Sequence, residues 1–204
     1  MLKGIDVSHH NNLDRILSMI DKPDFCIIKA TEGKTYNDPK FKHNIQICQE
    51  RDIPIGFYHY ARPENNQALF EAKHFLERVA PYIGKAILAL DWEDKALNYP
   101  VSWALTWLNY IYAQTGVKPL FYCSASYTKN LKTIYDNDYG LWVAHYTDLP
   151  KPTTGVYPYW AFWQYSTPEY NRTKPKVPCY CDYDYFNGSK AALEAYMKVH
   201  QPIF

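Results

Sequence analysis

Residues Ala86-Ile87-Leu88-Ala89-Leu90 form an unbroken apolar run that is followed at once by Asp91-Trp92-Glu93-Asp94. A short apolar run that ends in polar residues is typical of a strand inside a hydrophobic core. The acidic residues begin where the run ends, so they are expected at the carboxyl end of that strand. The segment therefore predicts a buried strand that ends in a cluster of carboxyl groups.

Similar strand-like runs lie on both sides of this segment and alternate with helical sequence. Apolar residues with the period of an amphipathic helix occur at Leu13 to Ile20, Phe41 to Cys48, Leu69 to Val79, Trp103 to Ile111 and Leu131 to Tyr135, and a last helix is expected over Ser189 to His200. The other seven strands are expected at Lys3 to Val7, Phe25 to Ala30, Ile53 to Tyr60, Pro119 to Cys123, Gly140 to His145, Tyr159 to Tyr165 and Cys181 to Phe186.

The alternation of strands and helices predicts parallel strands joined by right-handed crossovers, and eight strands predict a barrel. Helical sequence is weaker after the fifth strand, which indicates a barrel that is incomplete on that side. The predicted fold class is therefore α/β, an irregular barrel of the TIM type. The 204 residues are expected to form one domain, residues 1–204, because barrels commonly reach this size undivided.

The overall composition argues against several classes of partner. Lys and Arg total 22 and Asp and Glu total 21, with no long run of like charge, so no nucleic acid and no anionic membrane is expected as a partner. No apolar run reaches the length of a transmembrane helix, and we expect a soluble protein. The chain enters its first strand at Lys3, and no signal peptide is visible before it.

The five cysteines are Cys26, Cys48, Cys123, Cys179 and Cys181. They follow no disulfide-framework spacing, so we expect them to be mostly reduced. Cys179 and Cys181 lack the wider spacing and the second ligand pair of a typical zinc site. The sequence therefore predicts neither a metal nor another cofactor.

Asp91 and Glu93 are the sharpest chemical signal in the chain. In an eight-stranded barrel the active site lies at the carboxyl ends of the strands, where this pair is expected. Residues two apart on a strand point to the same face, with α carbons about 6–7 Å apart. Hydrolysis of a glycosidic bond needs one carboxylic acid to protonate the leaving oxygen and a second group to stabilise the oxocarbenium-like transition state. The pair therefore indicates a carbohydrate-cleaving site.

The ends of the other predicted strands supply polar and aromatic side chains that suit a carbohydrate cleft. Aromatic rings are expected to stack on sugar faces, and the polar groups to hydrogen-bond to sugar hydroxyls. Besides the acids Asp6 and Asp182, the residues expected to bind substrate are Lys29, Glu32, Tyr58, His59, Arg62, Tyr122, Trp142, Tyr146, Trp163 and Gln164.

Each of these residues also has a plainer interpretation. The acidic cluster at 91–94 is by itself compatible with a solvated turn, and its position after a buried run is what favours the catalytic interpretation. Asp6 is compatible with a helix cap, and Asp182 and Glu32 with polar turns. His59 and the strand-end aromatic residues are compatible with satisfied or packed core groups.

Seven short motifs that follow one another through almost the whole chain point to a known family. They are Gly4-Ile5-Asp6-Val7-Ser8, Ile28-Lys29-Ala30-Thr31-Glu32-Gly33, Gly56-Phe57-Tyr58-His59-Tyr60-Ala61-Arg62-Pro63, Leu90-Asp91-Trp92-Glu93, Leu141-Trp142-Val143-Ala144, Phe162-Trp163-Gln164-Tyr165 and Asp182-Tyr183-Asp184-Tyr185-Phe186. With these motifs in this order the chain resembles the family 25 glycoside hydrolases, the N-acetylmuramidase lysozymes of bacteria, phages and some fungi. Single motifs are weak evidence, but the set is specific.

The resemblance implies an irregular barrel of eight strands and about five helices, written (β/α)5(β)3. It implies a lysozyme that cleaves the β-1,4 bond between N-acetylmuramic acid and N-acetylglucosamine in peptidoglycan. Glu93 matches the family's proton donor, and Asp91 the carboxylate that orients the substrate acetamido group or otherwise supports the transition state. Asp6 and Asp182 match two further acids of the catalytic set. One departure is Asp184, where the family often has Asn.

The resemblance leaves two mechanisms open for the second step, and the strand geometry favours one of them. Asp91 and Glu93 come from one short segment and would approach the sugar from one side, whereas an enzymatic nucleophile and an acid flank the bond. We therefore expect a retaining reaction in which the 2-acetamido group of the substrate attacks. The charges of Asp6 and Asp182 are expected to help keep Glu93 protonated.

The same resemblance sets expectations for partner and location. The partner would be the glycan strands of bacterial peptidoglycan, and the protein would act at the cell wall as a monomer without a separate wall-binding domain. It would reach the wall by a release route of its own or after loss of a signal peptide.

Two rival functions come from other classes of protein. A metal-dependent polysaccharide deacetylase is suggested by Asp6 followed by His9-His10, although adjacent residues on a strand point to opposite faces. That enzyme would release acetate and lose activity on chelation, whereas a lysozyme releases reducing ends. A non-catalytic wall-binding barrel is disfavoured by the four acids.

Overall fold

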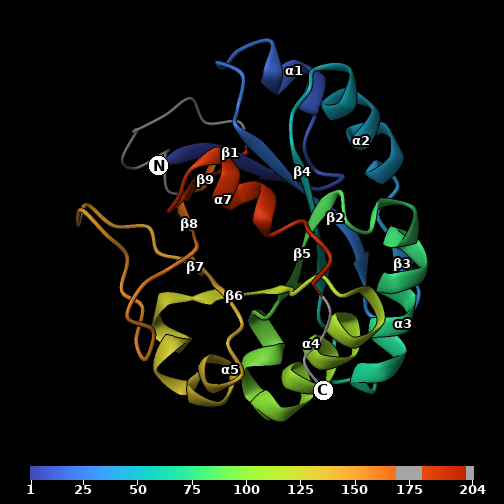
Figure 1. The fold of residues 1–204 in the computed structure, drawn as a ribbon, viewed down its shortest axis with the longest axis vertical. Coiled ribbons are helices and arrows are strands. Elements are labelled where there is room, and N and C mark those ends of the chain that lie inside the picture. Colours follow the sequence, from blue (N-terminus) through green and yellow to red (C-terminus); the bar gives the residue numbers. More distant parts are fainter. Residues whose placement is uncertain (169–180, 201–204) are drawn as a thin grey trace.

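The computed structural model describes residues 1–168 and 181–200. In these residues nine strands form one sheet with the order β1-β9-β8-β7-β6-β5-β4-β2-β3. Because β1 also pairs with β2, all strands except β3 close into a barrel (Figure 1). The strands are β1 Leu2–Val7, β2 Phe25–Glu32, β3 Tyr36–Asn37, β4 Ile55–Tyr60, β5 Ala86–Asp91, β6 Leu120–Ser124, β7 Leu141–Ala144, β8 Phe162–Ser166 and β9 Asp182–Phe186. The eight predicted barrel strands are confirmed.

The α-helices lie mainly outside this ring (Figure 1). Those of the described residues are α1 Leu13–Leu17, α2 Phe41–Glu50, α3 Ala68–Val79, α4 Val101–Thr115, α5 Lys132–Asp136 and α7 Lys190–Ala195, with 3₁₀ helices at Ala80–Tyr82, Asp94–Asn98 and Ala125–Asn130. The last helix is shorter than predicted, because it ends at Ala195. Within those parts of the chain, no helix has the length and apolar character needed to cross a membrane.

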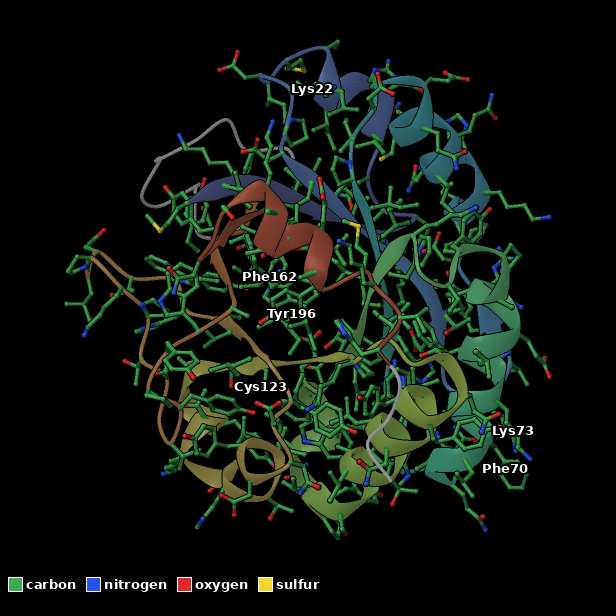
Figure 2. All side chains as sticks on the ribbon, viewed as in Figure 1. Lys22, Phe70, Lys73, Cys123, Phe162 and Tyr196 are labelled. Carbon is green, nitrogen blue, oxygen red and sulfur yellow. The ribbon has the colours of Figure 1, made fainter. Side chains whose placement is uncertain are left out.

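The alternation of side chains along each strand divides the core into two layers. On each strand every second side chain points into the barrel, as do Ile27, Ala89 and Phe162. The side chains between them, such as Ile28 and Leu88, pack under the outer helices. One end of the interior is closed by α7, whose Leu193 joins the inner cluster together with Met197, which lies just after the helix. Figure 2 shows Phe162 and Tyr196 together in the middle of the molecule, with their ring centroids 5.9 Å apart.

The last strand differs from the expectation that all strands run parallel. Of the eight neighbouring strand pairs in the ring, β9 is antiparallel to both β1 and β8, and the other six pairs are parallel. An antiparallel strand starts at the end where its parallel neighbours finish. Asp182, the first residue of β9, is therefore paired with Asp6 near the carboxyl end of β1 and lies at the same mouth of the barrel.

The predicted incompleteness lies in the outer layer and leaves the sheet intact. Residues 145–161, which join β7 to β8, contain no helix, whereas the ring of strands is closed by the β1–β2 and β1–β9 pairs. The outside of the barrel next to β8 is covered by aromatic side chains instead, among them Trp160, Trp163 and Tyr185.

Candidate active site

The inner positions nearest the carboxyl ends of the parallel strands carry a continuous polar set. Asp91 follows the inner residue Ala89 by two positions on β5, and Gln164 follows Phe162 by two positions on β8. Tyr122 and Trp142 belong to the inner cluster itself. Because side chains alternate between the two faces of a strand, these predicted polar residues all point inward and meet at one mouth of the barrel.

Glu93 lies just beyond β5 and has the properties of an acid at neutral pH. The intervening Trp92 is fully buried and packs on Trp103 of α4, with ring centroids 5.6 Å apart, so Asp91 and Glu93 both face the other way. Burial and the neighbouring charge of Asp94 raise the pKa of Glu93 to about 7, against the opposing effects of Lys29 and others. A large fraction of Glu93 is therefore protonated at pH 7.

Asp94 is held beside Glu93 by backbone and side chain together. Its φ of 50° is in the left-handed region, which few residues other than Gly, Asn and Asp adopt readily. The hydroxyl of Tyr60 donates a hydrogen bond of 2.5 Å to Asp94 Oδ2. This contact fixes the charge that helps keep Glu93 protonated.

Asp91 is more deeply placed than Glu93. Its residue exposure is only 6%, and burial together with the charge of Glu93 raises the pKa of its carboxyl group well above the usual value. Its Oδ1 atom is buried and has no hydrogen-bond partner among the described residues. A buried carboxyl oxygen normally has a partner, so this atom is available to a polar group of a substrate.

Gln164 connects several side chains of the cleft. Its Oε1 accepts hydrogen bonds from the hydroxyls of Tyr122 at 2.9 Å and of Tyr146 at 2.5 Å. Its Nε2 donates to Asp6 Oδ2 at 2.8 Å. Because both sides of the amide are engaged, the orientation of Gln164 is fixed, and it positions the two tyrosines beside Glu93.

Asp6 forms a second buried acid pair with Asp184. The two carboxyl groups share a hydrogen bond, and Trp142 Nε1 donates to Asp184 Oδ1 at 2.8 Å. Burial raises the pKa of Asp184 to about 7, and burial and Asp184 raise that of Asp6 well above its usual value. One proton shared between two such groups keeps their combined charge low.

Lys29, Glu32 and Arg62 form a chain of charges at the edge of the cleft. Glu32 accepts from Lys29 Nζ at 2.7 Å and from Arg62 Nε at 2.7 Å. Burial alone would raise the pKa of Glu32, but these hydrogen bonds and charges outweigh it and lower the pKa. The ring of Tyr60 lies between the two cations, 4.6 Å from each. The side chains of Lys29, Glu32 and Arg62 are thus held together at the edge of the cleft.

A groove of about 600 Å³ opens next to Glu93. Tyr122 and Tyr146, both predicted, line it together with Ser124, Ser126, Ala144, His145 and Thr153. Glu93 therefore faces a space that can admit part of a polymeric ligand. Sequence interpretation missed Ser126 and Thr153, because the first lies in the 3₁₀ helix Ala125–Asn130 and the second in the connection from β7 to β8, and no strand period predicts the course of either segment.

Comparison with known proteins agrees with this geometry. The family model described as "Glycosyl hydrolases family 25" matches residues 5–172. The chain belongs to this family. It is 33% identical over 208 residues to the uncharacterized protein YegX of Escherichia coli O157:H7, covering 96% of this chain and 73% of that protein. It is 29% identical to Lysozyme M1 of Streptomyces globisporus, covering 95% and 70% of the two chains.

The fold agrees as well. A family 25 lysozyme from Aspergillus fumigatus superposes with a TM-score of 0.77 at 25% identity, covering 97% of this chain and 99% of the other. The irregular barrel implied by the seven motifs is therefore confirmed, and the molecule is a family 25 glycoside hydrolase domain in fold and in sequence.

Two residues expected in the substrate cleft of this family 25 chain lie elsewhere. His59 is fully buried under the helices, where its ring nitrogens contact Thr31 Oγ1 and Glu71 Oε2 at 2.8 Å each. Trp163 lies on the outer side of β8, where Nε1 donates to the His145 carbonyl at 2.8 Å. The prediction is wrong for both because each stands one position off the inner register.

The expected effect of Asp6 and Asp182 on the pKa of Glu93 stays a prediction. Burial and Asp184 raise the pKa of Asp6 well above its usual value, which weakens the negative charge that Asp6 can offer. Burial and Asp94 are the main causes of the Glu93 shift. Asp184, which departs from the family pattern, was the signal for this outcome, because it shares its face of β9 with Asp182 and Phe186.

The arrangement needed by a metal-dependent deacetylase is not present in this family 25 barrel. Asp6 points to Gln164 inside the barrel, whereas His9 Nδ1 contacts Asp38 Oδ2 and the Tyr36 hydroxyl, both at 3.1 Å. Asp6 and the His9-His10 pair, whose ring centroids lie 3.8 Å apart, therefore do not converge. Over residues 1–168 and 181–200, no group of three or more His, Cys, Asp or Glu side chains could hold a metal ion.

Proposed function

We propose that this family 25 protein is a lysozyme that hydrolyses the β-1,4 bond between N-acetylmuramic acid and N-acetylglucosamine in peptidoglycan. The observation that carries the proposal is Glu93, which has a pKa of about 7 and lies between buried Asp91 and an open groove. A general acid works best when its pKa is close to the working pH. The names of its relatives, which include Lysozyme M1, support the same choice of substrate.

Glu93 acts first as acid and then as base. Protonated Glu93 donates its proton to the glycosidic oxygen while the bond from that oxygen to the anomeric carbon breaks. The carbonyl oxygen of the muramic acid acetamido group attacks the same carbon and forms a cyclic intermediate. Glu93, now a carboxylate, takes a proton from water as the water opens this ring. The anomeric configuration is retained.

We assign Asp91 to binding the acetamido group of the substrate rather than to attacking the anomeric carbon. It shares one side of the barrel mouth with Glu93, and a direct nucleophile would have to lie on the opposite side of the scissile bond. Asp91 Oδ1 is buried without a partner among the described residues, so a substrate N–H would satisfy it. Holding that N–H aims the acetamido oxygen at the reacting carbon.

The remaining residues of the mouth bind and shape the substrate. Tyr58, Tyr122 and Trp142 form the inner aromatic wall, in which the Tyr122 and Trp142 ring centroids lie 4.7 Å apart. Gln164 holds Tyr122 and Tyr146 in place, and Asp182 contributes at the rim next to Asp6. Lys29, Glu32 and Arg62 form the charged edge. The protein works on glycan strands at the cell wall, outside the cytoplasm, and as a single molecule.

Mass spectrometry of purified peptidoglycan after digestion tests the proposal. New muramic acid reducing ends are expected with the wild type, and none with Glu93→Gln. New N-acetylglucosamine reducing ends would contradict the assigned bond. Release of acetate without any new reducing end, sensitive to chelation, would overturn the proposal in favour of a deacetylase.

A further inference from the structure

A second pocket, which we call the basal pocket, lies at the end of the barrel away from the catalytic acids. It has a volume of about 700 Å³. Gly140 and Leu141 at the start of β7, Ala161 before β8, and Phe186 at the end of antiparallel β9 line it. These are the opposite strand ends from Asp91 and Glu93, so the two sites lie on opposite faces of the barrel.

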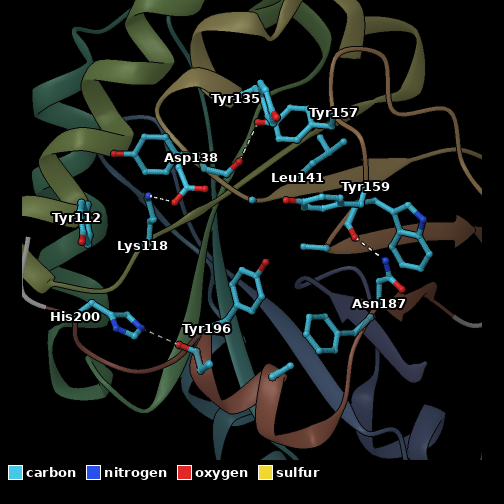
Figure 3. Close-up of a pocket in the computed structure, with 17 residues that line it drawn as sticks. Tyr112, Lys118, Tyr135, Asp138, Leu141, Tyr157, Tyr159, Asn187, Tyr196 and His200 are labelled. Atoms are coloured by element: carbon cyan, nitrogen blue, oxygen red, sulfur yellow. Dashed lines mark hydrogen bonds and ion pairs between the residues drawn. The ribbon is translucent and has the colours of Figure 1, made fainter.

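The walls of the basal pocket are mostly tyrosine rings. The six tyrosines are Tyr112, Tyr135, Tyr139, Tyr157, Tyr159 and Tyr196, and Trp160 and Phe186 add two more rings. Figure 3 shows Tyr112 on one side of the pocket, Tyr159 on the other and the Tyr196 hydroxyl directed between them. A concave surface lined by aromatic rings with a few polar groups is the usual form of a small-ligand site.

Two of these rings are more exposed than core aromatic residues. Tyr159 is 69% exposed and Tyr135 is 39% exposed. Tyr135 is held edge-on by Tyr157, with ring centroids 5.1 Å apart, so its position is set by packing. A ring that is fixed at the rim of a pocket, as Tyr135 is, offers a flat apolar face at little further cost in conformational entropy.

The charged groups of the basal pocket compensate one another. Lys118 Nζ and Asp138 Oδ2 form an ion pair of 2.7 Å, and Lys118 also lies over the rings of Tyr112 and Tyr139 at 5.7 and 5.5 Å. The charges of Lys118 and Asp138 cancel, so these two residues give the pocket no net charge that would attract an anion or a cation. An uncharged ligand is therefore favoured.

Polar atoms remain for a ligand rich in hydroxyl and amide groups. Asn187 lines the pocket, and its Nδ2 donates to the Trp160 carbonyl at 3.2 Å, which fixes an amide group in the pocket wall. The hydroxyl of Tyr196 points into the same space (Figure 3). Flat apolar rings combined with hydroxyl and amide groups match the two faces and the edges of a pyranose sugar.

We propose that the basal pocket is a second glycan-binding site, which takes a short uncharged stretch of N-acetylated saccharide. The identity of the sugar rests on the proposed function. A polymeric wall offers many copies of the same sugar. A protein that is already bound through the second site holds its catalytic cleft close to further sugars, which raises their effective concentration at the cleft. The second site itself takes no part in the reaction.

The test uses tri-N-acetylchitotriose titrated into the full-length Glu93→Gln protein and followed by backbone amide resonances. Resonances of Tyr159, Asn187 and Tyr196 are expected to shift, and Tyr159→Ala should weaken the Kd read from these shifts about tenfold. Tyr196→Phe, which removes only a hydroxyl, should weaken it less. Phe70→Ala is the matched control, because Phe70 is 55% exposed on α3, outside the pocket, and should change nothing (Figure 2).

Shifts confined to residues of the catalytic cleft, or an unchanged Kd in Tyr159→Ala, would overturn the inference. A second arm measures sedimentation of the same proteins with peptide-free glycan strands and with intact wall. Equal binding to both is expected, and binding only to wall that retains its peptides would assign the pocket to peptide instead. If the sugar binds here but the wild type cuts no wall, the proposed function falls and this inference stands.

Discussion

Glu93 illustrates how one residue obtains its chemistry from its immediate surroundings. Burial favours the neutral acid, the charge of Asp94 adds to this, and Lys29 opposes both, which leaves a pKa of about 7. Asp91, two residues earlier, is buried more completely, and its pKa is raised well above its ordinary value. The two carboxyl groups therefore differ through depth, and the shallower one faces the groove.

Glu93→Gln should abolish hydrolysis while leaving folding and glycan binding nearly intact. The amide keeps the shape of the side chain but cannot donate the proton, and general acid catalysis is worth about 10² to 10⁴-fold. The measurement is the initial rate of reducing-end release from purified wall, with thermal unfolding as the check on folding. Turnover close to that of the wild type would remove Glu93 from the role.

Asp94→Asn should move the basic limb of the pH–rate profile to lower pH. Activity requires protonated Glu93 and falls as the pH rises through its pKa of about 7. Removing the negative charge of Asp94 lowers that pKa, so the loss of activity begins earlier. Asn tolerates the left-handed backbone at this position and can still accept from Tyr60. The limb is read from kcat/KM between pH 5 and 9.

Asp136→Asn is the matched control for this shift, because Asp136 is a surface acid paired with Lys132 on α5. Its profile should coincide with that of the wild type. A basic limb that stays in place in Asp94→Asn would mean that burial alone sets the acidity of Glu93.

At the scale of elements, the contact between β4 and α3 shows how an outward-facing residue supports the cleft. Glu71 of α3 accepts hydrogen bonds from His59 Nε2 at 2.8 Å, from the backbone N–H of Arg62 at 3.0 Å and from Asn66 Nδ2 at 2.8 Å. One buried carboxylate thus fastens the strand and the loop that follows it. Arg62 is carried by that loop, so His59 influences the cleft only through the fold.

His59→Ala should lower the free energy of unfolding by about 3 kcal/mol, because it leaves the buried Glu71 short of a partner and opens a cavity. Urea unfolding at pH 7 measures this. Burial lowers the pKa of His59, so the unfolded chain takes up a proton more readily below about pH 6.5, and the wild type loses this contribution as the pH falls. The variant should lack that part of the pH dependence.

His43→Ala serves as the control, since the His43 side chain is 60% exposed beside Asp14. Its effect should stay within about 0.5 kcal/mol. If His59→Ala proved as mild as the control, the buried contact with Glu71 would not be an important link between β4 and α3.

The strands were predictable from sequence because each is a short apolar run between polar boundaries, and β5 with its acidic end is the clearest case. Whether an individual side chain points into or out of the barrel was less predictable. Tyr58 and Trp142 face the barrel interior, whereas His59 and Trp163 face outward, one position off the inner register of their strands. Counting two positions from an apolar inner residue would have excluded both.

At the scale of the whole molecule, the antiparallel β9 was not predictable from the strand pattern. Periodicity shows where a strand lies but not its direction, which depends on the connection before it. The reversal explains why Asp182 and Asp184 at the start of a strand join Asp6 and Asp91 at the ends of others. The basal pocket escaped sequence interpretation for a related reason, since its tyrosines come from loops and helix ends far apart in the chain.

The positions of Asp91 and Glu93 at the barrel mouth lead to a prediction about the substrate. Asp91 and Glu93 share one side of the mouth, so neither is placed to attack from the far side of the sugar, and the substrate acetamido group is the remaining nucleophile. Glycan that lacks the N-acetyl group on muramic acid should therefore resist cleavage. A thiazoline mimic of the cyclic intermediate should inhibit, and proton NMR of the first product should show the retained anomer. Matched glycan de-N-acetylated only on glucosamine is the control and should still be cut. A sugar ester trapped on Asp91, or an inverted first product, would refute this mechanism while leaving Glu93 as the acid.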